Sequence, residues 1–182
     1  MLMLRTPPLR SLLWVLLAAT PGLLACSSSD DDGSQSDAFS VDGIVREGAA
    51  SQTQLNTFVR HRPREWEWAG GQFDTPDDNA TLAADTPVTF AWHADPANFA
   101  QADDAGEVVM THLLVFSTRS NERLLGVFTT LPEYTPNAKD WQKLVDAGKP
   151  IALDLTTASF VGADLPEEGG PFIGQTITFA IQ

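Results

Sequence analysis

From about residue 86 onward, the chain alternates between apolar and polar residues with the period of two that is typical of half-buried β-strands. Apolar side chains fall on one face of residues 88–92, which predicts the first well-defined strand. Residues 108–116 form a longer apolar run, as expected for a central strand covered on both faces. Residues 123–130 follow after a polar turn and complete a predicted hairpin, in which Gly126 indicates a bulge or a close approach of another chain segment.

The period changes after Pro136, where Trp141, Leu144 and Val145 recur at helical spacing and Gly148 provides a stop signal. This pattern predicts one short helix.

Strict alternation returns in two further segments near the C-terminus. Residues 151–157 and 175–182 both alternate and predict the closing strands. Between them, residues 162–174 contain Pro166, a Gly-Gly-Pro run and three acidic residues, which predicts a long exposed loop.

The region 37–85 has only isolated apolar residues in a polar context. Ile44-Val45, Leu55 and Phe58-Val59 predict one or two additional strands at the start of the fold. Residues 74–85 are rich in aspartate and predict an acidic loop.

Several short strands with a single short helix and no alternation of strands and helices predict an all-β, antiparallel sandwich. We assign it to residues 37–182, with the best-defined part at 86–182. Over that part the order of segments resembles fibronectin type III and related immunoglobulin-like modules. The resemblance is carried by Pro87-Val88-Thr89-Phe90-Ala91-Trp92, a hairpin, Tyr134-Thr135-Pro136, a Gly-Gly loop and Thr176-Ile177-Thr178-Phe179. It implies a structural role for Trp92 in the core.

The N-terminus has the organisation of a secretory leader. Arg5 and Arg10 precede an apolar run at 11–24, which is shorter than the ~20 residues that a membrane-spanning helix needs. Leu23-Leu24-Ala25-Cys26 resembles the lipobox of bacterial lipoproteins. The resemblance implies cleavage between Ala25 and Cys26, removal of residues 1–25, and a diacylglycerol group on the Cys26 thiol. Because Ser27 follows the cysteine, the resemblance also favours the outer membrane as the location of the protein.

Residues 26–36 are small and acidic and predict an acylated N-terminus with a flexible tether. The formal net charge of the chain is −13. Removal of the leader takes away two arginines and no acidic residue, so the remaining chain is more acidic still. This charge argues against nucleic acid as a partner and against attachment through anionic headgroups, which leaves the acyl chains as the membrane anchor.

Trp66 and Trp68 alternate with Glu65 and Glu67, so both indoles point to one side. One interpretation is an aromatic platform on which sugar rings stack. The other is core filling, since buried aromatic residues dominate the packing of small domains.

Two kinds of metal site are compatible with the residue types. His93, Met110 and His112 suit copper, because imidazole and thioether groups bind it well. The alternative is a surface histidine and a packed methionine.

Clustered carboxylates favour calcium, but none has the spacing of an EF-hand loop. They are Asp74, Asp77, Asp78, Asp85, Asp103, Asp104, Asp164, Glu167 and Glu168. We predict no tightly bound cofactor.

The segment Arg60-His61-Arg62-Pro63-Arg64 is the one basic cluster and has the charge to dock an anionic partner. The alternative is a neutralising surface patch.

The sequence contains no Gly-x-Ser-x-Gly, His-Glu-x-x-His or phosphate-binding glycine loop. We therefore predict a lipid-anchored, non-enzymatic interaction or structural module of the cell envelope, whose partner is a protein or a polysaccharide. The alternatives are a carbohydrate-binding lipoprotein that uses Trp66 and Trp68, a metal-binding lipoprotein, and a hydrolase with loop carboxylates.

Overall fold

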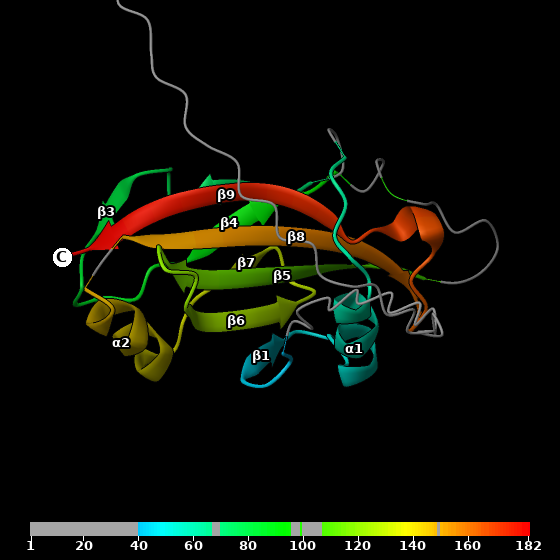
Figure 1. Ribbon diagram of the computed structural model, residues 1–182, viewed down its shortest axis with the longest axis horizontal. Helices are drawn as coiled ribbons and strands as arrows, with labels where there is room; N and C mark the ends of the chain where they lie inside the picture. Colours follow the sequence, from blue (N-terminus) through cyan, green and yellow to red (C-terminus); the bar gives the residue numbers. More distant parts are fainter. Residues whose placement is uncertain (1–39, 67–69, 96–98, 100–106, 149) are drawn as a thin grey trace, which may run out of the picture. The chain divides into compact units, whose positions relative to one another are not determined.

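The structure is a computed structural model that describes residues 40–66, 70–95, 99, 107–148 and 150–182. All of them belong to one compact unit, Ser36–Gln182. Most of its regular structure is β-strand, arranged in two sheets, and two short α-helices accompany them (Figure 1). The expected signal cleavage at Ala25, the lipidated Cys26, and Trp68 lie outside the described residues.

The large sheet has six strands, and its centre is a pair of eleven-residue strands, β5 and β8, that run antiparallel along their whole length. The order is β1 (Ile44–Glu47), β6 (Arg123–Thr129), β5 (Val108–Thr118), β8 (Ile151–Val161), β9 (Phe172–Ile181) and β3 (Ala80–Leu82). The edge strands β1 and β3 pair in parallel with β6 and β9. These two pairs correct the expectation of a wholly antiparallel sandwich.

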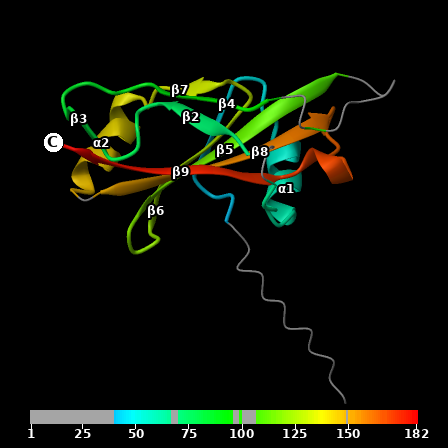
Figure 2. The same ribbon diagram turned by 90° about the horizontal axis from the view of Figure 1, so that it is seen from above.

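The small sheet consists of three antiparallel strands in the order β2 (Gln72–Thr75), β4 (Phe90–His93) and β7 (Glu133–Tyr134). It packs on one face of the large sheet (Figure 2). The main core lies between them, with Phe90 and Trp92 of β4 directed at Leu114 and Phe116 of β5. This arrangement is an all-β sandwich, and Trp92, only 2% exposed, takes the core position that the sequence predicted.

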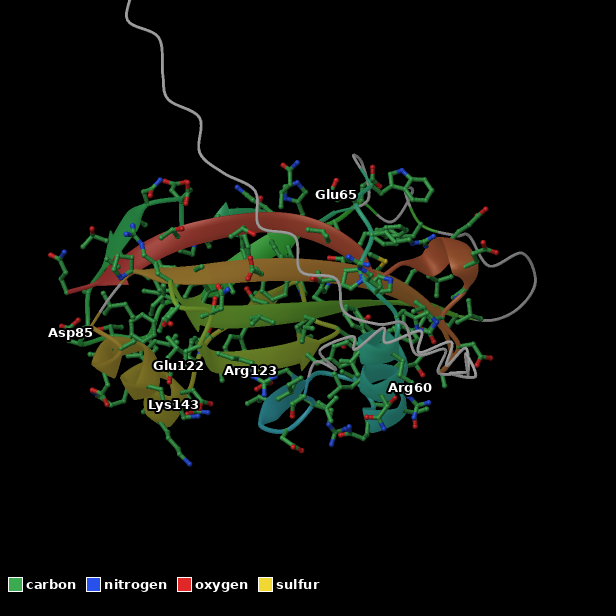
Figure 3. All side chains as sticks on the ribbon, viewed as in Figure 1. Arg60, Glu65, Asp85, Glu122, Arg123 and Lys143 are labelled. Atoms are coloured by element: carbon green, nitrogen blue, oxygen red, sulfur yellow. The ribbon has the colours of Figure 1, made fainter. Side chains whose placement is uncertain are left out.

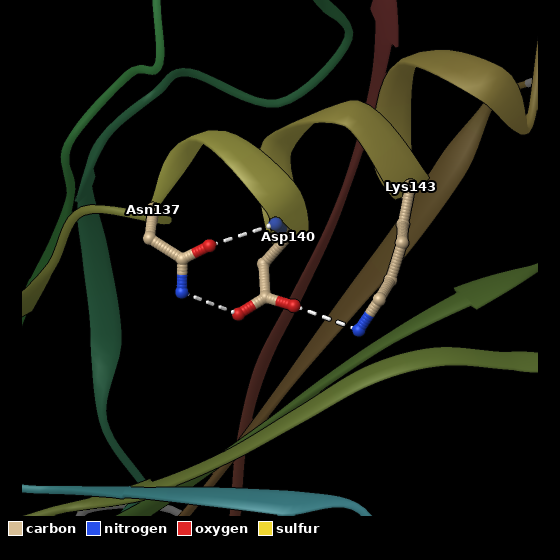
Figure 4. Close-up of polar contacts among 3 residues, drawn as sticks. All are labelled: Asn137, Asp140 and Lys143. Atoms are coloured by element: carbon tan, nitrogen blue, oxygen red, sulfur yellow. Dashed lines mark hydrogen bonds and ion pairs between the residues drawn. The ribbon is translucent and has the colours of Figure 1, made fainter.

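Helix α2 (Ala138–Asp146) closes the main core at one end through Trp141 and Leu144. Its start is fixed by Asn137, whose side-chain oxygen accepts a hydrogen bond from the backbone N–H of Asp140 at 3.0 Å (Figure 4). The Asp140 carboxylate accepts from the Asn137 amide at 2.8 Å and pairs with Lys143 Nζ at 2.7 Å. The predicted helix is confirmed, and Gly148 follows it with φ +57°.

Helix α1 (Gln52–Arg60) covers part of the opposite face of the large sheet (Figure 2). Leu55 and Phe58 point from it into a second core against Phe128 and Phe160. The expected strand at Leu55 and Phe58-Val59 is therefore wrong. Ser51 and Gln54 form a capping box, and this local signal starts a helix whose apolar residues repeat at helical spacing.

Two expected loops contain regular structure. The acidic region 74–85 includes the end of β2 and all of β3, since β3 pairs with β9. In the expected exposed loop 162–174, residues 169–172 are buried and β9 already begins at Phe172. The strands expected at 88–92, 108–116, 123–130, 151–157 and 175–182 are confirmed with shifted ends. Gly126 marks a close approach, because a Cβ there would lie 3.1 Å from Ile44 Cγ1.

Among the described residues, no helix combines the length and apolar character needed to cross a membrane.

Candidate functional site

An open groove of about 680 Å³ lies beside the start of β9. We call it the Trp66 groove. It lies between the segment that follows α1 and the first residues of β9, and Glu65 on that segment is visible in Figure 3. The lining residues are Glu65, Trp66, Gly70, Gly71, Gln72, Ile173, Gly174 and Gln175.

Backbone contacts build the floor of the groove. The N–H of Ile173 donates to the carbonyl of Arg64 at 2.9 Å, and the N–H of Gln175 donates to the carbonyl of Gly71 at 2.8 Å. A Cβ on Gly70 would lie 2.3 Å from the Ile173 carbonyl oxygen, and one on Gly174 would lie 2.6 Å from that of Gly71. Only glycine permits this approach of two backbones, so peptide groups form the floor of the groove.

The Trp66 side chain lies at the surface and is 45% exposed. Its ring meets the ring of Phe172 edge-on, with 5.1 Å between the centroids, and Phe172 is fully buried. The guanidinium of Arg64 covers the same Phe172 ring at 5.2 Å. Contact with the buried Phe172 ring therefore restricts the orientation of the Trp66 indole. Of the two interpretations of this residue, core filling does not apply to Trp66.

Polar groups surround the exposed indole. Glu65, Gln72 and Gln175 all line the groove, and Gln175 Oε1 accepts a hydrogen bond from the N–H of Phe73 at 2.8 Å. That bond fixes the Gln175 side chain and leaves its amide N–H donors available. An aromatic surface next to a carboxylate and two amides is able to stack on a sugar ring and to hydrogen-bond its hydroxyls.

A second, smaller pocket of about 260 Å³ is lined by His93, Met110 and His112, the three residues that suggested copper. We call it the His-Met pocket. Trp92, Ala94, Thr130 and Pro132 complete its lining. It lies where β4 ends, beside the first half of β5.

The two histidines differ in environment. The side chain of His93 is 62% exposed, and its Nδ1 lies 2.8 Å from Asp74 Oδ1. His112 is 5% exposed, its Nδ1 lies 3.1 Å from Thr157 Oγ1, and its ring meets that of Trp92 at 5.5 Å. Burial lowers the pKa of His112 to about 4, so the ring is neutral at physiological pH. The surface interpretation thus holds for His93 and fails for His112.

Two polar atoms near this region are buried without a hydrogen-bond partner among the described residues. They are Nε1 of Trp92 and Oγ of Ser159. Ser159 stands opposite Met110 in the pairing of β8 with β5.

The acidic clusters do not converge. Within the described ranges, no group of three or more His, Cys, Asp or Glu side chains is placed to hold a metal ion. Asp78 uses its carboxylate to accept from the backbone N–H of Thr178 at 2.7 Å, and Asp74 contacts His93. Asp103 and Asp104 lie outside the described residues.

The basic cluster is divided between two roles. Arg64 donates to the carbonyl of Glu167 and covers Phe172. His61, Arg62 and Arg64 line a third pocket of about 410 Å³, and Arg60 lies at the end of α1 (Figure 3). Arg64 is therefore structural, and the rest of the cluster is surface.

Sequence reasoning missed the floor and far wall of the Trp66 groove. Ile173, which is 45% exposed, and Gly174 were expected in a loop. The available signal was the pair of glycine sites, Gly70-Gly71 and Gly174, because isolated glycines next to a strand indicate a close backbone approach.

Comparisons of the chain with models of protein families, with curated proteins and with solved structures find no match.

Proposed function

We propose that the protein is a lipid-anchored, non-enzymatic interaction module of the cell envelope, and that it binds carbohydrate at the Trp66 groove. The observation that carries the proposal is the half-exposed indole of Trp66 beside an open groove. Trp66 is the single exposed tryptophan among the described residues, and it shares the groove with Ile173, which is also 45% exposed.

The groove is preorganised for a ring-shaped polar ligand. Its floor is fixed by backbone hydrogen bonds and its indole by Phe172, so little side-chain freedom is lost when a ligand binds. The ring offers an apolar face, and Glu65, Gln72 and Gln175 offer both donors and acceptors. Sugars combine apolar C–H faces with hydroxyls that need both kinds of partner.

The anchor in this proposal is the acylated Cys26, with outer-membrane attachment. The described fold begins at Ser40, where the Arg123 guanidinium donates to the carbonyls of Ser40 and Asp42 at 2.5 and 2.6 Å (Figure 3). Residues 27–39 would then connect the anchor to this point, and if fully extended they span at most about 45 Å. A short tether of this kind raises the local concentration of a weak binder at the membrane surface.

We assign the sandwich to the immunoglobulin-like, fibronectin type III-like class as part of the same proposal. Strand order supports this assignment. With β2, β4 and β7 taken as strands A, B and E, the small sheet has the order A-B-E. With β5, β6, β8 and β9 taken as C, C′, F and G, four strands of the large sheet have the order C′-C-F-G.

Trp66→Ala tests the groove. We expect this substitution to weaken carbohydrate binding at least about tenfold, which corresponds to ~1.4 kcal/mol. The measurement is a titration of the purified protein with a panel of envelope and extracellular polysaccharides. Leu131→Ala is the matched control, because Leu131 is 44% exposed and does not line the groove. If no polysaccharide binds to the wild type, or if both variants bind alike, the groove is not a glycan site.

Cys26→Ala tests the anchor. We expect the wild type in the membrane fraction, and mass spectrometry of its N-terminal peptide to show an acylated Cys26. The variant should lack the acyl groups, and its unfolding temperature should match that of the wild type, because the cores are built from residues of the described fold. An unmodified sulfhydryl in the wild type, or an N-terminus at another residue, would remove the membrane assignment.

A further inference from the structure

We propose that the Trp66 groove and a neighbouring basic pocket together bind a polysaccharide in which neutral sugars alternate with uronic acids. The neutral ring stacks on Trp66, and the carboxylate of the adjoining uronic acid binds Arg62 and Arg64. This inference rests on the proposed carbohydrate binding at the Trp66 groove and adds the chemical class of the ligand. The basic pocket is the hollow of about 410 Å³ whose lining includes Arg62, Arg64, Glu167 and Gly170.

The two hollows follow one another along the same pair of chain segments. Arg64 and Phe172 face each other in a parallel bridge. The N–H of Arg64 donates to the carbonyl of Pro171 at 3.0 Å, and the N–H of Ile173 donates to the carbonyl of Arg64 at 2.9 Å. Residues before this bridge in both segments line the basic pocket, and residues after it line the Trp66 groove. A single extended ligand can therefore occupy both hollows.

The Phe172 ring sets the spacing of the two binding surfaces. The Trp66 ring contacts it with 5.1 Å between the centroids, and the Arg64 guanidinium carbon lies 5.2 Å from the same centroid. The centre of the indole and the guanidinium carbon are thus at most about 10 Å apart. Consecutive units of one polysaccharide chain span such a distance.

The basic pocket carries a positive charge in a chain of net charge −13. Across the described ranges, no carboxylate lies within ion-pair distance of Arg62 or Arg64. Glu167 also lines the pocket, but it contacts Arg64 through its backbone carbonyl, and a guanidinium with five N–H donors has others to offer. Two arginines and one glutamate leave one positive charge in excess. This excess suits the single charge of a carboxylate better than the higher charge of a phosphate monoester.

The Trp66 groove has the opposite preference. Glu65 lines it and is exposed (Figure 3). A uronic acid stacked on Trp66 would bring its carboxylate close to that of Glu65, and like charges repel. A neutral ring on Trp66 and a charged unit at the basic pocket avoid this repulsion. The arrangement therefore selects a polysaccharide of alternating charge over one that is charged on every unit.

Hyaluronan is the probe, because it alternates a neutral N-acetylated sugar with glucuronate. Carboxyl-reduced hyaluronan is the matched probe, since it has the same backbone without the charges. At about 0.15 M salt, where the Debye length is about 8 Å, acidic groups elsewhere on the protein are largely screened from the site. We expect the purified protein to bind hyaluronan at least about tenfold more tightly than the reduced polymer, because arginine forms charge-assisted hydrogen bonds with carboxylates.

Arg62→Gln tests the basic pocket, and Arg119→Gln is the matched control. Both residues are exposed and both substitutions remove one positive charge, but Arg119 lines neither hollow. Arg62→Gln should reduce the preference for hyaluronan at least about threefold and leave the affinity for the reduced polymer unchanged, whereas Arg119→Gln should change neither. Both variants should unfold near the wild-type temperature, because substitutions of exposed side chains have small effects on stability.

The outcomes separate this inference from the proposed function. Trp66→Ala should weaken the binding of both polymers, since its indole stacks on the neutral ring. Equal affinity of the wild type for both polymers, or an equal loss in Arg62→Gln and Arg119→Gln, would overturn the role of the basic pocket and leave the Trp66 groove as a site for neutral sugars. Tighter binding of polygalacturonate, which is charged on every unit, would overturn the alternating pattern. If no polysaccharide binds, the proposed function fails and this inference fails with it.

Discussion

The free energy of unfolding is expected to fall by about 2 kcal/mol between pH 7.5 and pH 5 on account of His112 alone. His112 is 5% exposed, and burial lowers its pKa to about 4 from the ordinary value of 6.5. In the unfolded chain the imidazole is exposed to water and takes up a proton near pH 6.5. In the folded protein it stays neutral until about pH 4.

The direction in which the free energy of unfolding changes with pH follows from proton uptake by the unfolded chain. Between pH 6.5 and 4, the unfolded chain binds one more proton at His112 than the folded chain does, so acidification favours unfolding. The slope approaches 1.4 kcal/mol per pH unit, and the full loss is about 3 kcal/mol below pH 4. The contribution is fully present above pH 6.5. Acidification also reduces the repulsion within a chain of net charge −13, and this opposes the loss.

A difference measurement separates the two effects. Urea unfolding of wild type and His112→Gln, without added metal, should give curves of stability against pH that converge as the pH falls from 7.5 to 5. His61→Gln is the control, because it removes an exposed imidazole and keeps the buried one. Parallel curves for wild type and His112→Gln would show that the His112 imidazole does not stay neutral in the folded state.

The strands that carry the main core were predictable because each has a face that is buried against another layer. Ile151, Leu153 and Leu155 alternate with half-buried residues on β8 as the period of two requires. Helix α2 was equally clear, since Trp141 and Leu144 share its buried face.

Helix α1 was missed because its buried face is narrow. Only Leu55 and Phe58 are large buried apolar residues in a nine-residue helix, and such a short pattern also fits a strand. The capping box at Ser51 and Gln54 was the better signal. The short strand β3 was hidden in an acidic sequence for another reason, because its pairing partner β9 lies far away in the chain.

The sequence indicated which residue types could form the candidate sites, but it did not indicate whether each side chain would be buried or exposed. Trp66 and Trp92 have the same chemistry, yet one lies at the surface and the other is 2% exposed. Likewise, His93 and His112 differ only in which sheet they belong to and which way they face. Strand register decides the environments of Trp92 and of the two histidines, whereas Trp66 lies outside the named strands. Both kinds of placement depend on contacts between segments that sequence alone does not locate.

Phe116→Ala is expected to destabilise the fold by about 4 kcal/mol, which is the cost of a large cavity in a rigid core. Phe116 is fully buried on β5. Its ring lies 5.1 Å from that of Phe90 on β4, 6.5 Å from that of Tyr134 on β7, and 6.4 Å from that of Phe179 on β9. It therefore joins the two sheets at the centre of their interface, and neighbours on several elements would have to move to fill the space.

The measurement is urea unfolding at pH 7.5, together with the unfolding temperature, which should fall by roughly 10 °C or more in a domain of this size. Val108→Ala on the same strand is the control. Val108 is 37% exposed, so its loss should cost no more than about 0.5 kcal/mol. Since the chain's one cysteine leaves no possibility of an internal disulfide, packing of this kind is its main source of stability. A loss below about 1 kcal/mol in Phe116→Ala would mean that the sheets are not joined through this ring.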